Sequence, residues 1–390
     1  MFSLDNFYYI LYENLLKPAN LYALHFYPFG TTSSENLQQN FENPPKADNT
    51  ILHHCLFYDQ EPLIDTHFEK LNFPQRMHLF FTSKWCKILA NSEHSLLKKQ
   101  ICKDNEYIDW YYFYHGFAAL DWYRDFQYFP KVDFPITKVF ISLNHLTIKD
   151  RSYRLLLTSH LINKHLLEKG HVSLHINKNW SDELSDPFTK LPSKTIPFVR
   201  EQISKLPGPL TLDSSNVTGS ASAEFNHTTI KYNKEALWHI VSETVYYYEK
   251  LHLTEKVFKP IVHKRPFILV AAPGNLAYIK SYGFKTFDKW IDESYDCECD
   301  PAIRIEKIVK ELDKLCSLSD SQLQQMYIEM QEVLEHNFNH FYGNFKKIIV
   351  DELVDNFESS IDRWNNGRID NRNIDKTNLN FPQVKKLLLQ

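Results

Sequence analysis

The chain has 390 residues, and because a typical domain has roughly 150 residues, this length favours two globular domains over one. Hydrophobic residues make up 43% of the sequence and charged residues 24%, a balance that excludes disorder for most of the chain. The formal net charge is -4 and no long basic block is present, so we do not expect tight binding to a nucleic-acid backbone.

Short apolar runs alternate with helical periodicity over residues 50–125. The runs that predict strands are 51–59, 78–83 and 107–116, and the stretch that predicts a helix is near 84–99. This alternation is typical of parallel βαβ units. Pro130 and Pro135 disfavour a helix around them, so we place a domain boundary there and expect a first domain over residues 1–130.

A second block repeats the pattern after this boundary. Strands are expected at 138–143, near His171, at 237–244 and at 266–271, and helices at about 151–168, from Thr254 and after Pro273. The stretch 178–232 has little periodicity and is expected to form long loops. From Pro301 to about Trp364 the periodicity is helical. The sequence therefore predicts an α/β fold with two parallel-sheet domains, the second over 136–300, and helices over 301–390 that pack on or bridge them.

The densest polar cluster is S-E-T-V-Y-Y-Y-E-K-L-H-L-T-E-K at 242–256. Thr254 is a suitable N-cap for the following helix, and Glu255 and Lys256 occupy its first turn. Free N–H groups, the helix dipole and the Lys256 ammonium favour an anion such as a nucleoside diphosphate, and a carboxylate beside them can accept from sugar hydroxyls. The alternative is that these residues only cap a surface helix.

A second cluster, N-H-L-T-I-K-D-R-S-Y-R at 144–154, follows a strand of buried type. Asn144 ends the strand, and the spacing of Arg151 and Arg154 places both guanidinium groups on one face of the next helix. Because ligands of parallel sheets bind at the carboxyl ends of the strands, these side chains are placed to meet phosphate groups. The alternative is a solvated pair of arginines that interacts with Asp150.

Two carboxylates and a proline end the first predicted strand of the chain, in F-Y-D-Q-E-P at 57–62. In a partly dry cleft, burial and like-charge repulsion raise the pKa of a carboxyl group towards the range of a general base. Asp59 and Glu61 are therefore candidate bases. The alternative is that these acids cap the following helix.

No metal motif stands out in the sequence. In H-N-F-N-H at 336–340, Asn337 replaces the glutamate that zinc proteases need, so a surface or core histidine pair is favoured. C-E-C-D at 297–300 offers two thiols without a second pair. Six cysteines without a C-x-x-C pair favour a reducing compartment. Acids near the N-terminus and the lack of an apolar run of about 18 residues predict a cytoplasmic protein without a membrane span.

Together these clusters resemble the α-1,3-fucosyltransferase-like glycosyltransferases, inverting enzymes of the GT-B architecture, in which two Rossmann-like domains face a cleft. L-T-E-K at 253–256 is similar to the family's Y-x-T-E-K donor motif, and V-S-E-T at 241–244 stands where the family has F-E-N-S. D-W-Y-R-D at 121–125 is similar to the family's Y-R-x-D-S-D stretch, without its second pair of acids. The segment 266–296 is closer to a subgroup of phage and bacterial glycosyltransferase-like proteins.

The resemblance implies an N-terminal acceptor domain and a C-terminal domain that binds a nucleotide sugar, with a GDP-fucose-like donor favoured. It implies that Glu255 contacts the ribose, that Lys256 contacts the donor phosphate, and that one of the two arginines meets the pyrophosphate. The residues expected at the donor site are Asn144, Arg151, Arg154, Glu243, Thr254, Glu255 and Lys256.

The acceptor-domain motif F-E-S-P of the family is matched by D-Q-E-P at 59–62 in its glutamate and proline only. The resemblance makes Glu61 the general base, with Asp59 as a helper that raises its pKa or as the base itself.

The expected activity is metal-independent, inverting transfer of a sugar from a nucleoside-diphosphate donor to a hydroxyl acceptor, expected to be a glycan, with no cofactor. No isolated D-x-D follows a predicted strand, so cationic side chains are expected to stabilise the leaving diphosphate in place of a metal. Two alternatives stay open. One is a non-catalytic carbohydrate-binding or virion-associated module on the same fold, and the other is a sugar transferase that acts on modified nucleic acid.

Overall fold

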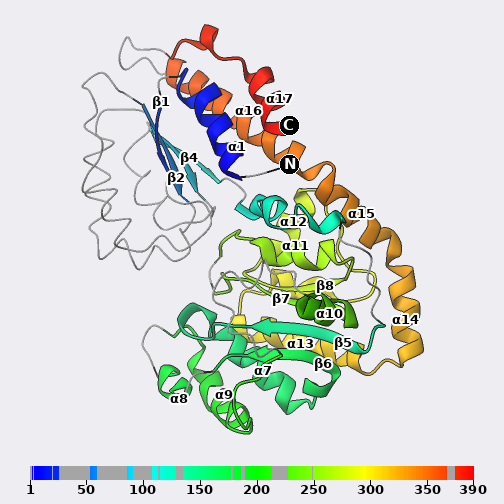
Figure 1. Ribbon diagram of the computed structural model, residues 1–390. Coiled ribbons are helices and arrows are strands. Elements are labelled where there is room, and N and C mark those ends of the chain that lie inside the picture. Colours follow the sequence, from blue (N-terminus) through cyan, green and yellow to red (C-terminus); the bar gives the residue numbers. More distant parts are fainter. Residues whose placement is uncertain are drawn as a thin grey trace. The chain divides into compact units, whose positions relative to one another are not determined.

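Figure 1 shows the computed structural model of the chain. The residues that it describes are 2, 4–19, 21–25, 53–58, 86–90, 108–112, 115–128, 135–176, 179–185, 189–212, 227–247, 249–366 and 374–390. The chain divides into two compact units by its internal contacts. Unit 1 combines Met1–Asp121 with Phe345–Gln390, and unit 2 is Trp122–Asn344.

Unit 1 contains a four-stranded sheet with the order β1-β2-β3-β4. Its strands are β1 (Leu21–His25), β2 (His53–Tyr58), β3 (Cys86–Ala90) and β4 (Ile108–Tyr112), and every neighbouring pair is parallel. The strands predicted at 51–59 and 107–116 are confirmed by β2 and β4, whereas the one predicted at 78–83 lies outside the described residues. The helices of this unit include α1 (Leu4–Leu11), the π-helical turn η1 (Tyr12–Leu16), α16 (Phe345–Asn366) and α17 (Phe381–Leu389).

The helix predicted near 84–99 is wrong at its start, because residues 86–90 form strand β3. This strand contains Lys87, whose side chain is completely buried. In the sheet, β3 pairs with β2 on one side and β4 on the other, which places Lys87 beside Asp109. A buried parallel strand is recognised in a sequence by its continuous apolar run. A charged residue interrupts that run even when its side chain is buried, so the strand is not predicted.

Helix α16 is joined to this sheet through the same lysine. Lys87 Nζ donates to Asp109 Oδ2 at 2.5 Å, to Ser360 Oγ at 2.6 Å and also to Asn356 Oδ1. Arg363 Nη2 reaches the other oxygen, Asp109 Oδ1, at 2.6 Å. Three residues of α16 therefore complete a network that begins on β3 and β4, which explains why residues 345–390 group with the N-terminal strands.

Unit 2 contains a second parallel sheet, with the order β6-β5-β7-β8. Its strands are β5 (Lys138–Asn144), β6 (Gly170–Leu174), β7 (Ala236–Ser242) and β8 (Phe267–Val270), and its connecting helices include α7 (Tyr153–Asn163), α11 (Glu255–Val262) and α12 (Asn275–Ser281). The strands and helices predicted for this block are confirmed. Every residue of β7 and β8 is buried, as expected of parallel strands covered on both faces.

The stretch 178–232 is not only loop. It contains the short helix α8 (Trp180–Glu183), the helix α9 (Ile196–Ile203) and the start of α10 (His227–Glu235). Helix α9 packs against α7 through a face that buries Val199, Gln202 and Ile203. Its eight residues form too short a periodic segment to stand out among the surrounding polar residues.

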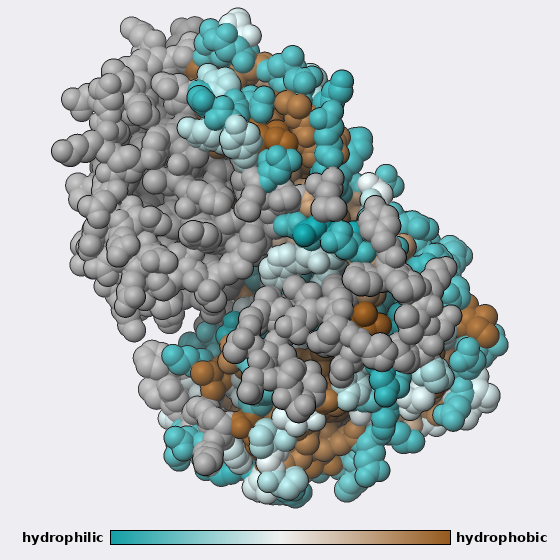
Figure 2. Space-filling view, in the orientation of Figure 1, coloured by the Kyte–Doolittle hydropathy of each residue, from teal (hydrophilic) through white to brown (hydrophobic). Residues whose placement is uncertain are grey.

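The helices predicted after Pro301 are confirmed and are divided between the units. Helices α13 (Pro301–Cys316), α14 (Asp320–Glu329) and α15 (Gln331–Tyr342) belong to unit 2, whereas α16 and α17 belong to unit 1. On the face shown in Figure 2, hydrophilic residues cover most of the described helices and hydrophobic residues surface in small groups. None of the helices in the described ranges combines the length and apolar character needed to cross a membrane.

Candidate functional site

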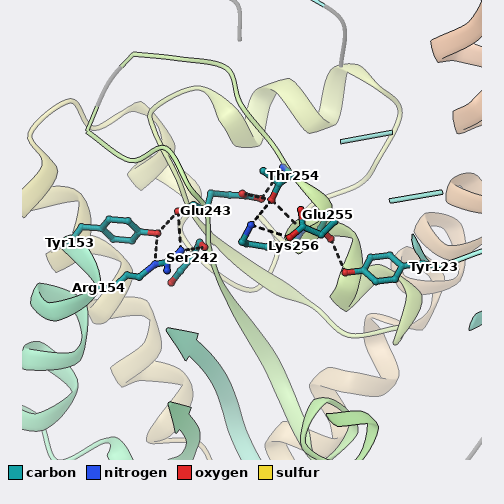
Figure 3. Close-up of polar contacts among 8 residues, drawn as sticks. All are labelled: Tyr123, Tyr153, Arg154, Ser242, Glu243, Thr254, Glu255 and Lys256. Atoms are coloured by element: carbon teal, nitrogen blue, oxygen red, sulfur yellow. Dashed lines mark hydrogen bonds and ion pairs between the residues drawn. The ribbon is translucent and has the colours of Figure 1, made fainter. Parts of the chain in front are cut away.

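Five of the seven sequence-predicted donor residues meet at the carboxyl end of β7, where α11 begins (Figure 3): Arg154, Glu243, Thr254, Glu255 and Lys256. Glu243 directly follows β7 and is completely buried. Its Oε1 accepts from the Thr254 main-chain N–H at 3.3 Å and its Oε2 accepts from the Thr254 hydroxyl at 2.8 Å. A single glutamate side chain thus bridges the end of the central strand and the first residue before α11.

Thr254 is the N-cap of α11, as the sequence predicts. Its main chain is extended, and its hydroxyl oxygen accepts from the Lys256 N–H at 3.4 Å. The Lys256 ammonium donates to the same oxygen at 3.0 Å and to Glu255 Oε1 at 3.1 Å. The Lys256 side chain is 30% exposed and that of Glu255 is 9% exposed. The ammonium therefore lies at the positive end of the helix dipole, on a side chain that is partly exposed.

Burial raises the pKa of the Glu243 carboxyl above its ordinary value, and the Glu255 carboxylate acts in the same direction. Lys256 and the two hydrogen bonds from Thr254 act against this and offset it only in part. A proton is therefore easier to place on Glu243 than on an exposed glutamate. The site combines an acid that resists ionisation with a lysine and a second carboxylate next to it.

The two arginines of the second cluster have different environments. Arg154 is 5% exposed, and its guanidinium donates to the carbonyl oxygens of Leu146 at 2.9 Å and of Ser242 at 3.0 Å. A longer contact of 3.4 Å reaches the Glu243 carbonyl. Arg154 therefore ties the loop after β5 to the end of β7, and its remaining donor, Nε, contacts the Tyr153 hydroxyl at 3.3 Å.

Arg151 lies in the turn η4 (Lys149–Arg151) just before α7. Within the described ranges, no hydrogen bond or close ion pair of its guanidinium is seen, although the Asp150 carboxylate attracts it electrostatically. Burial and the neighbouring Arg154 lower the pKa of Arg151, although an arginine remains charged at neutral pH after such a shift. Of the two arginines, Arg151 is the one with donors left for a ligand.

Asn144 ends β5 with a completely buried side chain. Its Nδ2 donates to Ser142 Oγ at 3.1 Å, whereas its Oδ1 has no hydrogen-bond partner among the described residues. Ser142 pairs with Ile240 in the sheet, so continuing the register by two residues places Asn144 beside Ser242. The Ser242 hydroxyl is likewise without a hydrogen-bond partner in that part of the chain. Adjacent strands thus end in two polar groups with unused bonding capacity.

A second helix, α12, begins after β8, but the chain's own carboxylate occupies its N-terminus. Asp296 accepts from the Leu276 N–H at 2.9 Å and from the Ala277 N–H at 3.1 Å. Gly274 stands before the helix with φ 81°, a left-handed conformation that glycine adopts without strain. Asp296 thus uses the N–H groups that an anionic ligand would need, whereas α11 offers Lys256 at its start.

The remaining sequence-predicted candidates are the two possible bases and the possible metal ligands. Asp59 and Glu61 lie outside the described residues. In the 336–340 motif, His336 donates to the Gly283 carbonyl at 2.9 Å and His340 to the Tyr282 carbonyl at 2.6 Å. These two histidines hold a loop. Within the described ranges, no three or more His, Cys, Asp or Glu residues cluster in a way that could hold a metal ion.

Sequence reasoning missed two tyrosines of the site. The Tyr153 hydroxyl donates to the Glu243 carbonyl at 2.5 Å, and the Tyr123 hydroxyl donates to the Glu255 carbonyl at 3.2 Å. Tyr123 is the central residue of D-W-Y-R-D, a segment that the sequence singles out without a role. Both tyrosines lie in segments that the sequence analysis singles out, but the residues that they contact can be identified only from the fold.

Comparison of the chain with family models, curated proteins and solved structures found no match. Its function must therefore be inferred from the site itself.

Proposed function

We propose that the protein is an inverting glycosyltransferase that transfers a sugar from a nucleoside-diphosphate donor to a hydroxyl acceptor. The observation that carries the proposal is the start of α11, where Thr254, Glu255 and Lys256 meet the buried Glu243 at the carboxyl edge of a parallel sheet. Ligands of such sheets bind at this edge, and a helix N-terminus with a lysine favours a phosphate.

The donor diphosphate would replace a carboxylate of the chain as the partner of Lys256. In the structure, the Lys256 ammonium is paired with the Glu255 carboxylate. A diphosphate group carries more negative charge than this largely buried carboxylate, so Lys256 would turn to the phosphate. Glu255 would then accept hydrogen bonds from hydroxyl groups of the ribose. The same residues thus serve as a closed pair without ligand and as two separate contacts with it.

The transfer itself needs a base and a stabilised leaving group. The base removes the proton of the acceptor hydroxyl, whose oxygen attacks the anomeric carbon from the face opposite the diphosphate. The bond from that carbon to the diphosphate oxygen breaks, and its electron pair leaves with the nucleoside diphosphate. Lys256, the α11 N-terminus and Arg151 would stabilise this developing charge without a metal ion. Glu61, with Asp59 as alternative, is proposed as the base.

In this proposal the chain has the GT-B arrangement, with the acceptor domain at its N-terminus and the nucleotide sugar on the sheet of unit 2. A GDP-fucose-like donor is favoured by the resemblance of 253–256 to the fucosyltransferase-like motif. The acceptor is proposed to be a glycan. The main competing function is a carbohydrate-binding module without turnover, which would use the same donor residues for binding only.

Calorimetric titration with nucleoside diphosphates and their sugars tests the binding step. A diphosphate should bind the wild type, and Lys256→Ala should weaken binding by about tenfold or more because a charge-assisted contact is lost. Lys307→Ala is the matched control, since Lys307 lies on another helix, α13, is 37% exposed and forms a comparable ion pair of 2.8 Å with Glu298. Equal affinity of wild type and Lys256→Ala would contradict the assignment of this site.

Turnover is tested separately by donor hydrolysis without added acceptor. Release of nucleoside diphosphate from a donor that binds would support the transferase. A donor that binds at the Lys256 site and is never cleaved, with or without acceptors, would instead identify a binding module.

A further inference from the structure

We propose that Tyr123 and Tyr153 are positioning residues that hold the two glutamates of the donor site from opposite sides. This inference rests on the proposed function, because it assigns a role towards the nucleotide that unit 2 is proposed to bind. Each tyrosine donates its hydroxyl hydrogen to the main-chain carbonyl of one glutamate. Figure 3 shows the two rings on either side of the cluster formed by Glu243, Thr254, Glu255 and Lys256.

Tyr153 has a fixed orientation. It is completely buried, and its ring stacks on that of Tyr246 with centroids 4.2 Å apart and an interplanar angle of 16°. Tyr246 is itself held by the Arg304 guanidinium, 4.1 Å from its ring centroid, and by its hydroxyl bond of 2.6 Å to the Pro301 carbonyl. With its ring locked on this stack, the Tyr153 hydroxyl has one carbonyl to meet, that of Glu243 at 2.5 Å.

Tyr123 is held as firmly on the other side. Its side chain is completely buried, and its own carbonyl accepts from the Tyr342 hydroxyl at 2.9 Å, at the end of α15. Burial and the negative charge of Glu255 and Glu243 raise the pKa of Tyr123 well above its ordinary value, so its hydroxyl keeps its proton. It therefore remains a donor to the Glu255 carbonyl, in the first turn of α11.

These two bonds hold the main chain at the two glutamates. A carbonyl held by a buried donor fixes its peptide plane and restricts rotation about the Cα–C bond of its residue. At Glu243, this restraint supports the main-chain position from which the carboxylate reaches the N–H and hydroxyl of Thr254. At Glu255, it sets the start of α11 and with it the place of the Lys256 ammonium. The tyrosines thus fix the spacing between the end of β7 and the phosphate site.

The chain offers a matched control for this proposal. Tyr247 belongs to the same aromatic group, with its ring 6.2 Å from that of Tyr153 in an edge-to-face arrangement. Its hydroxyl is hydrogen-bonded to Ser152 Oγ at 3.0 Å. Tyr247→Phe therefore removes one hydroxyl from the cluster without removing a bond to the carbonyl of Glu243 or Glu255.

The experiment compares Tyr123→Phe, Tyr153→Phe and Tyr247→Phe with the wild type in the full-length protein. Each is titrated calorimetrically with nucleoside diphosphates, and its thermal midpoint is recorded. Amide hydrogen exchange at Thr254 is followed without ligand. We expect Tyr123→Phe and Tyr153→Phe each to weaken nucleotide binding by about fivefold, the loss of one hydrogen bond, and Tyr247→Phe to stay within about twofold of the wild type. Exchange at Thr254 should accelerate in Tyr153→Phe and stay unchanged in Tyr247→Phe.

The outcomes separate this inference from the proposed function. If the wild type binds a nucleoside diphosphate and both tyrosine variants bind it equally well, the positioning role is overturned and the donor site stands. An equal loss of affinity in Tyr247→Phe would also overturn it, because general loosening of the aromatic group would then explain the effect. If the wild type binds none of the nucleotides, the proposed function fails and this inference with it. Either tyrosine variant is sufficient for the test if the other does not fold.

Discussion

The Thr254 hydroxyl donates to Glu243 Oε2 at 2.8 Å and accepts from the Lys256 ammonium at 3.0 Å. One hydroxyl therefore connects a buried acid to the cation at the start of α11. Both bonds are made by the hydroxyl oxygen of Thr254, so both are lost when that oxygen is removed. This makes Thr254 the residue whose loss separates the two halves of the donor site.

Replacement of Thr254 by valine should destabilise the protein, because valine keeps the shape of threonine and removes its hydroxyl. Glu243 loses one of its two bonds to this residue and α11 loses its cap, at a cost of about 1–3 kcal/mol in the free energy of unfolding. Urea unfolding of Thr254→Val measures the loss. Thr254→Ser, which restores the oxygen, should recover most of it, and failure of serine to do so would show that the methyl group rather than the hydroxyl is what matters.

Glu243 should make the stability of the protein depend on pH. Its pKa is raised in the folded state above the ordinary value of 4.5, chiefly by burial. A group of this kind stabilises the fold fully below the unfolded-state pKa, and that contribution is lost as the pH rises through the folded-state pKa. Glu243→Gln keeps an oxygen that accepts from Thr254 and carries no charge to bury.

The measurement is urea unfolding of wild type and Glu243→Gln at a series of pH values from 4 to 8. The difference between them isolates Glu243, since other groups titrate in both proteins. We expect the wild type to lose stability relative to Glu243→Gln as the pH rises above about 4.5, the ordinary pKa of a glutamate. A constant difference, or one of opposite slope, would contradict the raised pKa.

Arg151 and Arg154 show which features of the site can be predicted from the sequence and which cannot. The sequence correctly places both after the strand that ends at Asn144, but only Arg154 lies on helix α7, because Arg151 ends the preceding turn η4. The sequence cannot distinguish their roles, because these depend on what lies opposite. Carbonyls of Leu146 and Ser242 surround Arg154, and the second of these belongs to a strand 88 residues away.

The same limit explains what was missed in unit 1. Periodicity predicts α16 as a helix, but not the sheet that it joins, since the partner of Ser360 and Asn356 is a lysine about 270 residues earlier in the chain. Strand β3 was hidden by that lysine. Fully buried apolar strands such as β8 were predicted well because no tertiary partner is needed to recognise them.

The buried lysine of unit 1 should be one of the most sensitive positions for stability. Asp109→Ala leaves the Lys87 ammonium inside the protein without its carboxylate, which should lower the free energy of unfolding by about 3–5 kcal/mol. Glu13→Ala, which breaks the exposed ion pair with Lys17 at 3.0 Å, is the control and should have a far smaller effect. Equal effects of the two variants would show that the buried network adds nothing.

Turnover should persist when divalent metal ions are removed. The proposed leaving-group contacts are Lys256, the α11 N-terminus and Arg151, and these supply positive charge by themselves. Initial rates of nucleoside-diphosphate release in EDTA and in added Mg²⁺ or Mn²⁺ are the test. Loss of the reaction in EDTA and recovery with a divalent ion would show that a metal carries the leaving group. Arg151→Met should lower the rate in both conditions, whereas Lys307→Ala should not.

The general base is the prediction that depends on sequence alone, since Asp59 and Glu61 lie outside the described residues. Glu61→Gln keeps the size and hydrogen bonding of the side chain and cannot take a proton. Transfer to an acceptor should therefore fall by about 100-fold or more, while donor affinity stays near that of the wild type. Asp59→Asn should have a smaller effect if Asp59 only raises the pKa of Glu61. Wild-type transfer by Glu61→Gln together with loss of transfer in Asp59→Asn would move the base two residues towards the N-terminus, and the donor site on unit 2 would be unaffected by that result.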